Sequence, residues 1–239
     1  MVAEVDHGRE WLGVAPAIWQ IVNLAQPYPW AVGPTSRKRL ADLVPPDEFS
    51  AVFATDDSAL INRHLRSTLA PRLAGRDRTL AAAVACWVVR SWGGIKGGPQ
   101  QTIVDWSDAL GRYGGAAVND FIERHRDDRI SSWSKLLAFA DHANHAIYDA
   151  RTAVALNCAL AALQDSRRFH MPASQNRRVF AARRKFLQEP NFEARGYRDY
   201  LNLLTCFVVM RGAADLLSAE MTLFANAPNV AEAFVSPKS

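Results

Sequence analysis

The chain has 239 residues, 49% of them hydrophobic, which is enough for one large domain or two interlocked subdomains with a sizeable core. No apolar run is long enough to span a membrane and the polar N-terminus is not a secretory signal, so we expect a soluble, cytoplasmic protein. Three scattered cysteines in apolar surroundings, without a C-x-x-C pair, argue against zinc and predict buried thiols: Cys86, Cys158 and Cys206.

The net charge of +4 is unevenly distributed along the chain. Residues 1–60 hold four Lys/Arg and eight Asp/Glu, so the remaining residues carry +8. Within these, residues 165–185 hold seven Arg/Lys and one Asp. A basic surface fits an anionic partner such as nucleic acid, and the alternative is an ordinary basic protein whose charges are solvated.

In chain order, residues 1–60 are predicted to be irregular apart from a short helix near 10–24, because prolines interrupt the segments 26–34 and 44–49. The later segments have helical apolar spacing. Residues 78–92 are apolar on nearly all sides, as in a buried helix, and are followed by a glycine-rich stretch. Helices are predicted over 59–73, 78–92, 100–114, 116–126, 133–141, 149–164 and 197–225.

No alternating strand pattern of useful length and no repeat is present, so the sequence predicts an all-α fold with 78–92 and 149–163 as core helices. We expect one domain over 1–239. Its parts are an N-terminal part, a helical core, and a basic segment with C-terminal helices, over 1–75, 76–165 and 166–239.

The stretch "GGIKGGPQ" (93–100) invites comparison with a phosphate-binding loop. The pattern G-x-x-x-x-G-K-[ST] is absent and no predicted strand precedes the glycines, so a nucleotide-binding loop is not supported. Two interpretations remain open, a plain turn between helices and a loop that lies near a DNA backbone.

A lysine and a carboxylate stand at two predicted helix starts. Taken alone, Lys135 is explained as a solvated surface lysine and Asp149 as a helix N-cap. A helix from Lys135 to Asp141 rises only about 9 Å, whereas the loop 142–148 can span roughly 20 Å. The loop can therefore return Asp149 to the level of Lys135, and both side chains would then face one cleft.

The segments "WSKLLAF" and "AIYDARTAVALN" resemble the helix-hairpin-helix DNA glycosylases, in the 8-oxoguanine DNA glycosylase branch. In that family a hairpin ends in a Ser/Thr-Lys pair, and an apolar-x-Asp-x-(His/Arg) pattern follows at a helix start. The resemblance implies that Lys135 is the nucleophile, Asp149 the essential carboxylate and Arg151 a basic DNA contact. It is clearest over 130–160, and the helical architecture extends it over 80–225.

The hairpin departs from the family pattern. The usual Gly-apolar-Gly-(Ser/Thr)-Lys is replaced by Ser131-Ser132-Trp133-Ser134-Lys135, and the spacing from lysine to aspartate is shorter than in well-known members. The resemblance still places these hairpin residues against DNA: Ser131, Ser132, Trp133 and Ser134.

A glycosylase takes its target base out of the duplex, and the resemblance implies a pocket that stacks on it. An exposed lysine is protonated at pH 7, so the site has to favour the neutral amine by burial or nearby positive charge. The candidate stackers, each with core packing as its alternative, are Trp92, Phe139 and Tyr148, with Trp133 as a further possibility. The basic segment would meet phosphates, above all through Arg177 and Arg178, or would be a solvated helix face.

These features predict a lysine-dependent DNA glycosylase, with or without lyase activity, that needs no metal or other cofactor. Its expected partner is double-stranded DNA carrying a modified base, with no membrane and no required protein partner. By family default the base is an oxidised purine such as 8-oxoguanine. A bulky phage base such as glucosylated hydroxymethylcytosine, removed in antiviral defence, is the second possibility. The alternative class is a non-catalytic helical DNA-binding or complex-forming protein.

Overall fold

Many helices of this chain begin at a proline or at a side chain that caps their first amides. The computed structural model describes residues 10–111, 115–189 and 192–236. Residues 1–9, the polar N-terminus that is predicted not to be a secretory signal, lie outside the described residues. So do residues 112–114, at the end of the helix expected over 100–114.

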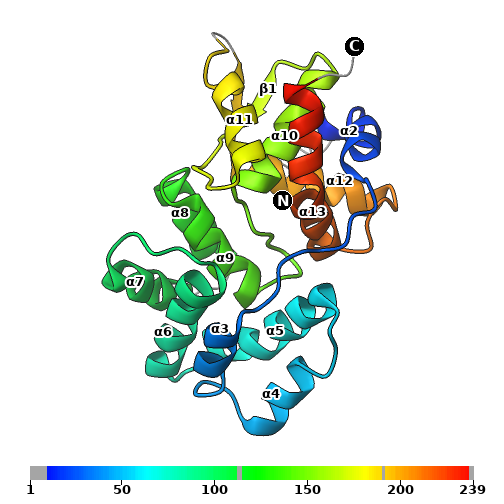
Figure 1. The fold of residues 1–239 in the computed structure, drawn as a ribbon. Coiled ribbons are helices and arrows are strands. Elements are labelled where there is room, and N and C mark those ends of the chain that lie inside the picture. The colour runs from blue at the N-terminus through cyan, green and yellow to red at the C-terminus, as the bar shows by residue number, and fades with distance from the viewer. Residues whose placement is uncertain (1–9, 112–114, 190–191, 237–239) are drawn as a thin grey trace. The chain divides into compact units, whose positions relative to one another are not determined.

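The described chain is almost entirely helical, as the sequence predicts (Figure 1). Its helices and strands are α2 (Ala15–Val22), α3 (Pro34–Leu40), α4 (Pro46–Val52), α5 (Ser58–Leu73), α6 (Arg78–Cys86), the π-helix η1 (Trp87–Trp92), α7 (Gln100–Leu110), α8 (Gly115–His125), α9 (Ile130–Ala140), α10 (Ala150–Ala162), β1 (Arg167–Phe169), α11 (Arg177–Phe186), β2 (Glu193–Arg195), α12 (Tyr197–Val209) and α13 (Leu216–Val235).

The expectation of an irregular N-terminal part is wrong for two segments. Pro34 begins α3 and Pro46 begins α4. Proline is well suited to the first turn of a helix, because its missing N–H would have no intrahelical acceptor there and its φ is already helical. The prolines at 26–34 and 44–49 therefore start helices as well as ending the segments before them.

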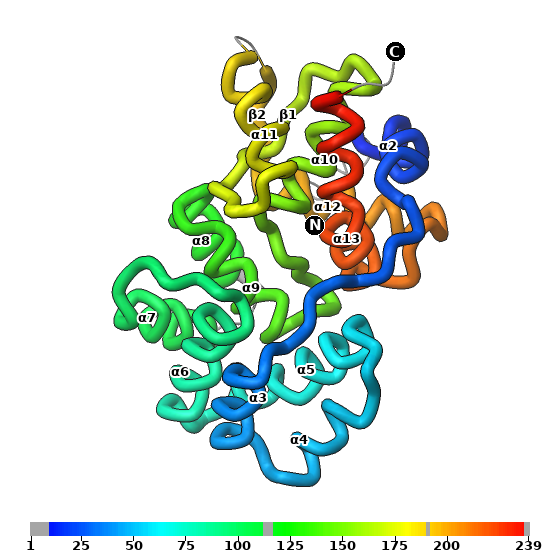
Figure 2. The backbone as a smooth tube through the Cα atoms, viewed as in Figure 1, coloured from blue at the N-terminus to red at the C-terminus, as the bar shows by residue number. Residues whose placement is uncertain are grey.

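The chain divides into two compact units. The continuous unit is Pro29–Ile147. The discontinuous unit consists of the described residues up to Tyr28 and those from Tyr148 onwards. Figure 2 shows how α2, near the start of the chain, lies beside α13, near its end, inside the discontinuous unit.

In the continuous unit, α9 is the central helix and packs against α5, α7 and η1. Its buried face is unusually wide, since every residue from Ser132 to Phe139 is buried. The predicted core segment 78–92 is confirmed, but it is α-helical only to Cys86 and continues as the π-helix η1.

In the discontinuous unit, α10 is the central helix and packs against α2, α11, α13 and β1. The second predicted core segment is thereby confirmed, and Asn157 within it is fully buried. Its amide donates to Phe169 O at 2.9 Å and its carbonyl accepts from Phe169 N at 2.7 Å, which joins α10 to β1. The three-residue strands β1 and β2 pair in parallel and are too short to leave an alternating pattern in the sequence.

The cysteines largely follow the prediction of buried thiols. Cys158 and Cys206 are buried, Cys86 is half-buried, and all three are free. Burial raises the pKa of Cys158 to about 12, which keeps this thiol protonated and unreactive at neutral pH. None of the helices among the described residues is long and apolar enough to cross a membrane.

Candidate active site

A tight turn, 126–129, joins α8 to α9, and it is the helix–turn–helix element that precedes Lys135. Arg126 and Arg129 have left-handed backbones in it, with φ of 42° and 51°. The indole N–H of Trp133 donates to Asp128 O at 2.9 Å and so ties the turn to α9. The turn between α8 and α9 therefore ends at Arg129, whereas the sequence predicts a hairpin over 131–135.

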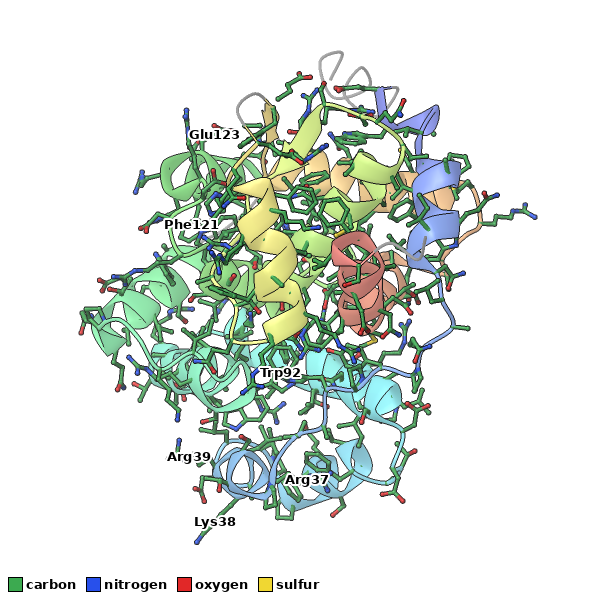
Figure 3. The ribbon with its side chains drawn as sticks, turned by 45° about the horizontal axis from the view of Figure 1, so that its top comes forward. Arg37, Lys38, Arg39, Trp92, Phe121 and Glu123 are labelled. Atoms are coloured by element: carbon green, nitrogen blue, oxygen red, sulfur yellow. The ribbon has the colours of Figure 1, made fainter. Side chains whose placement is uncertain are left out.

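The four residues expected to contact DNA, 131–134, lie inside the first turns of α9 instead. Ser131 is half-buried and Ser132 is buried, while Trp133 and Ser134 are completely buried. Trp133 also packs edge-on against Phe121 of α8, labelled in Figure 3, with ring centroids 5.9 Å apart. Trp133 thus lies on a buried face of α9 and connects this helix to α8 and to the turn 126–129.

Lys135 is a buried lysine, with only 5% of its surface exposed. Its amine donates to Ser131 O, one helical turn earlier, at 2.5 Å. Its methylene groups pass beside Gly93, where a Cβ would lie 2.9 Å from Lys135 Cδ and 3.0 Å from Cε. The backbone at the end of η1 thus makes room for the stem of this lysine.

Gly93 was not singled out by the sequence reasoning, which treated 93–99 as one turn. The residue has an ordinary helical backbone (φ −76°, ψ −12°), so its lack of a side chain is not explained by a left-handed conformation. Its amide donates to Val88 O at 2.8 Å, which closes the last wide turn of the π-helix. Such π-turns within helices often occur at functional sites. The signal available in the sequence was a glycine directly after an unusually apolar helix.

Asp149 is the N-cap of α10, as its position in the sequence predicts. Its Oδ1 accepts from the amides of Arg151 at 2.8 Å and Thr152 at 3.1 Å. The hydroxyl of Thr152 accepts in turn from the Asp149 amide at 3.0 Å, which completes a capping box. Both bonds to the carboxylate use Oδ1, and Oδ2 accepts no hydrogen bond from the described residues.

Three buried polar residues, Thr152, Tyr200 and Glu220, interact with one another close to Asp149, and the sequence did not indicate this group. Tyr200 of α12 is hydrogen-bonded to the side chain of Thr152. Burial raises the pKa of Tyr200 well above its usual value, and the carboxylates of Glu220 and Asp149 raise it further. Glu220 of α13 is itself 2% exposed. Tyr200 therefore supports the threonine that completes the cap on Asp149.

The three aromatic residues expected to line a base pocket are packed in two cores. In the continuous unit, Trp92 meets Phe139 edge-on at 4.9 Å, and its indole N–H donates to Asn62 Oδ1 at 2.7 Å. In the discontinuous unit, Tyr148 packs edge-on against Tyr200 at 5.0 Å. Trp92 and Phe139 are thus brought together, and all three rings are buried.

The expected DNA-contacting arginines differ in their surroundings. Arg151 lies over the ring of Phe224 at 4.3 Å. Arg178 is exposed but pairs with Glu232 at 3.1 Å. Arg177 is exposed and makes no ion pair with the described residues. Of these three, Arg177 is the one whose charge is most available to an anion.

Lys135 belongs to the continuous unit and Asp149 to the discontinuous unit. Lys135 lies on α9 and Asp149 caps α10. No group of three or more metal-binding side chains occurs in the described ranges. Comparison of the chain with protein-family models, with curated proteins and with solved structures found no significant match in any of the three.

The packing at Gly93 leads to a stability prediction. In Gly93→Ala the new methyl group would lie 2.7 Å from Val89 O, a backbone atom, as well as against Lys135. We expect a loss of about 1–3 kcal/mol in the free energy of unfolding, the usual range for overpacking. The matched control is Gly97→Ala in the same loop, where no atom lies within 4 Å of the added carbon. Urea unfolding of both variants measures the difference, and equal stabilities would contradict the described packing.

Proposed function

We propose that this chain is a lysine-dependent DNA glycosylase. The observation that carries the proposal is Lys135, the lysine that the motif singles out, which is buried on a helix that directly follows a tight turn between two helices. Lysine is almost never fully buried in proteins unless it is paired, so a buried lysine at the motif position is an unusual feature. Asp149 adds support, because it begins the next helix and keeps one carboxylate oxygen available.

In the proposed reaction, Lys135 Nζ forms a bond to C1′ of the target nucleotide while the bond from C1′ to the base breaks. The base leaves with the electron pair and takes up a proton, and the attacking nitrogen loses one proton. The C1′–O4′ bond of the sugar then breaks while O4′ takes up a proton, and the nitrogen lone pair forms the double bond to C1′ of a protonated Schiff base. Water can then hydrolyse the Schiff base, or β-elimination can cleave the strand. In the ground state the amine donates to Ser131 O, so the attack requires that this hydrogen bond be released.

Asp149 would stabilise the positive charge that develops on the sugar as the base departs. Capping and catalysis do not compete for the same atom, because the cap uses Oδ1 and leaves Oδ2. Tyr200 and Thr152 would then act as positioning residues that hold the carboxylate in a fixed orientation.

The burial of 131–134 changes the expected contact with DNA. The exposed part of the helix–turn–helix element is the turn 126–129, whose Arg126 and Arg129 are both exposed. We therefore propose that this turn, and not Trp133 or Ser134, lies against the phosphate backbone. The guanidinium groups of the two arginines can donate hydrogen bonds to phosphate oxygens, while Asp127 and Asp128 of the same turn balance their charge.

A second candidate function, a non-catalytic nucleic-acid-binding protein, is favoured by one face of α11. Arg177, Phe180, Arg184 and Leu187 are spaced at i, i+3, i+7 and i+10, which places them on one side of the helix. Phe180 is 45% and Leu187 58% exposed. Basic side chains interleaved with exposed apolar ones suit a nucleic-acid strand, whose phosphates attract arginines and whose bases stack on aromatic rings.

Lys135→Gln separates the two functions. We expect it to abolish base excision and covalent trapping by borohydride on oligonucleotides that carry 8-oxoguanine or glucosylated hydroxymethylcytosine. The screen also identifies the substrate. The control is Lys38→Gln, which replaces an exposed lysine of α3, labelled in Figure 3. Thermal melting checks that both variants are folded. Full trapping by folded Lys135→Gln protein would exclude this lysine as the nucleophile.

For Asp149→Asn we expect near-normal stability, because asparagine caps helices about as well as aspartate. Base excision should slow at least about a hundredfold, since stabilisation of a developing charge typically contributes several kcal/mol. The matched control is Asp57→Asn at the cap of α5, which should leave excision unchanged. If excision by Asp149→Asn proceeds at the wild-type rate, Asp149 is a helix cap only.

Charge on α11 is tested by salt dependence. Replacing Arg177 and Arg184 with Ala should flatten the slope of log affinity against log salt by about one unit per lost phosphate contact. The control replaces Arg178, which pairs with Glu232, and Arg183, which donates to Met171 O at 2.9 Å. We expect a smaller change in the control. Equal slopes in wild type and Arg177/Arg184 variant would mean that this face is solvated in the complex.

A further inference from the structure

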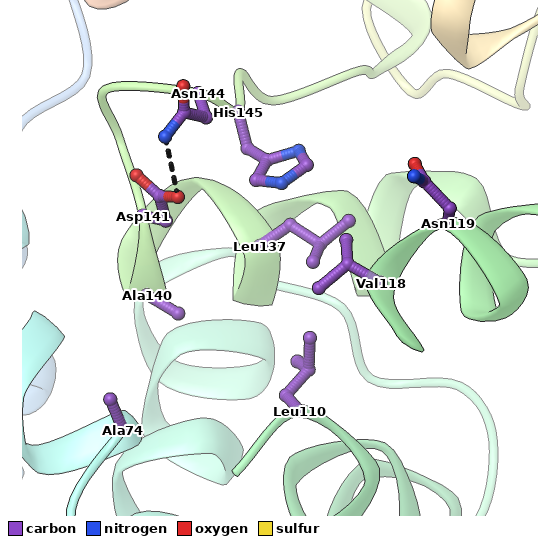
Figure 4. A pocket seen from close by; sticks show the side chains of 9 residues that line it. All are labelled: Ala74, Leu110, Val118, Asn119, Leu137, Ala140, Asp141, Asn144 and His145. Carbon is purple, nitrogen blue, oxygen red and sulfur yellow. Dashed lines mark hydrogen bonds between the residues drawn. The ribbon is translucent and has the colours of Figure 1, made fainter. Parts of the chain in front are cut away.

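The continuous unit contains a pocket of about 440 Å³ that none of the expected site residues lines. Its size falls within the range of small-molecule sites in proteins, roughly 300–1,000 Å³. The lining comes from the C-terminal ends of α5, α7 and α9, from α8, and from the segment after α9 (Figure 4). The lining residues are Ala74, Leu110, Val118, Asn119, Leu137, Ala140, Asp141, Asn144 and His145.

The lining is divided into an apolar part and a polar part. Leu110, Val118 and Leu137 provide the apolar side chains, and Figure 4 shows them facing one another. The polar groups include Asn119 of α8 and the side chains that follow α9. An apolar surface beside a few convergent polar groups is the usual composition of a binding pocket, in which the former gives affinity and the latter orient the ligand.

The polar part is held in place by hydrogen bonds within the segment after α9. Asn144 Nδ2 donates to Asp141 Oδ2 at 2.9 Å, drawn as the dashed line in Figure 4. The amide of His145 donates to Asp141 O at 2.9 Å, and the amide of Asp141 donates to Leu137 O at 2.8 Å. These bonds fix Asp141 before any ligand arrives, which lowers the ordering cost of binding.

The electrostatics of the pocket favour a positive charge. Three helices end at it, at Leu73, Leu110 and Ala140, and helix C-termini carry partial negative charge. The lining residues contain one carboxylate, that of Asp141, and neither Lys nor Arg. Burial lowers the pKa of His145, although the Asp141 carboxylate opposes the shift, so the imidazole adds no positive charge at neutral pH.

The chain itself places a guanidinium close to two of these helix ends. Arg78 donates to Ser107 O in the last turn of α7 at 2.5 Å and to Gly75 O beyond α5 at 3.3 Å. Its charge is balanced by Asp108, 3.2 Å away. The third helix end is that of α9, where the carboxylate of Asp141 makes no ion pair with the described residues. A cation from outside the chain could therefore bind at this end.

We propose that this pocket binds a small organic cation, whose amine, amidine or guanidinium group pairs with Asp141 and whose apolar body lies on Leu110, Val118 and Leu137. The inference is independent of the glycosylase proposal, because no lining residue takes part in the proposed reaction. It assigns to the continuous unit a ligand site of its own.

Benzamidine, a flat ring with a cationic head, is the probe, and benzoate is the matched anion of similar shape. We expect calorimetric titration of the full chain to show saturable benzamidine binding, with benzoate at least about fivefold weaker. Asp141→Asn should weaken benzamidine binding about threefold to fivefold, the upper part of the range for a largely exposed ion pair. The control Asp42→Asn removes another exposed carboxylate of the same unit and should leave binding unchanged.

Two further variants test the position of the site. Ala140→Phe on α9 and Ala74→Phe beyond α5 each place a ring in the pocket from a different element, and each should abolish benzamidine binding. Melting curves show which of the two variants is folded. If one of them does not fold, the other one alone tests the position of the site. Equal binding of benzoate and benzamidine, unchanged binding by Asp141→Asn, or full binding by a folded filled variant would overturn the proposal.

Discussion

The hydrogen bonds that Asp149 accepts from the amides of Arg151 and Thr152 determine where α10 begins, and the discontinuous unit is built around α10. A helix buried on nearly all sides leaves no water to satisfy its first amides. The carboxylate of Asp149 supplies the missing hydrogen-bond acceptor at the N-terminus of α10. Tyr200 extends the same network from α12, so a helix later in the chain supports the start of α10.

The continuous unit solves a different packing problem at α9. A lysine on a fully buried helix needs both space for its stem and an acceptor for its amine. The π-helix η1 and Gly93 provide the space, and Ser131 O provides the acceptor. A side chain held in this way has fewer accessible rotamers than a lysine on the surface.

Local sequence was sufficient for the features that depend on local chemistry. The apolar segments 78–92 and 149–163 identified core helices, and Asp149 was recognised as a cap because capping depends on the next three residues. Features that depend on tertiary packing were out of reach. Trp133 was expected at a DNA backbone, yet it is buried against Phe121 of α8, a contact that the local sequence does not reveal. The reason for a glycine at position 93 is its contact with Lys135, which lies more than forty residues later in the chain. The strands β1 and β2 are too short for a periodic signal.

The division of the chain has a consequence for its synthesis. The apolar face of α2, with Ile18, Trp19 and Val22, packs in the structure on elements from the second half of the chain. During translation the continuous unit emerges complete before those elements exist. At about 5–20 residues per second, α2 waits roughly 7 to 43 seconds for its partners. For that time this aromatic, apolar helix lacks the partners that bury it, and we expect a nascent-chain chaperone to bind it.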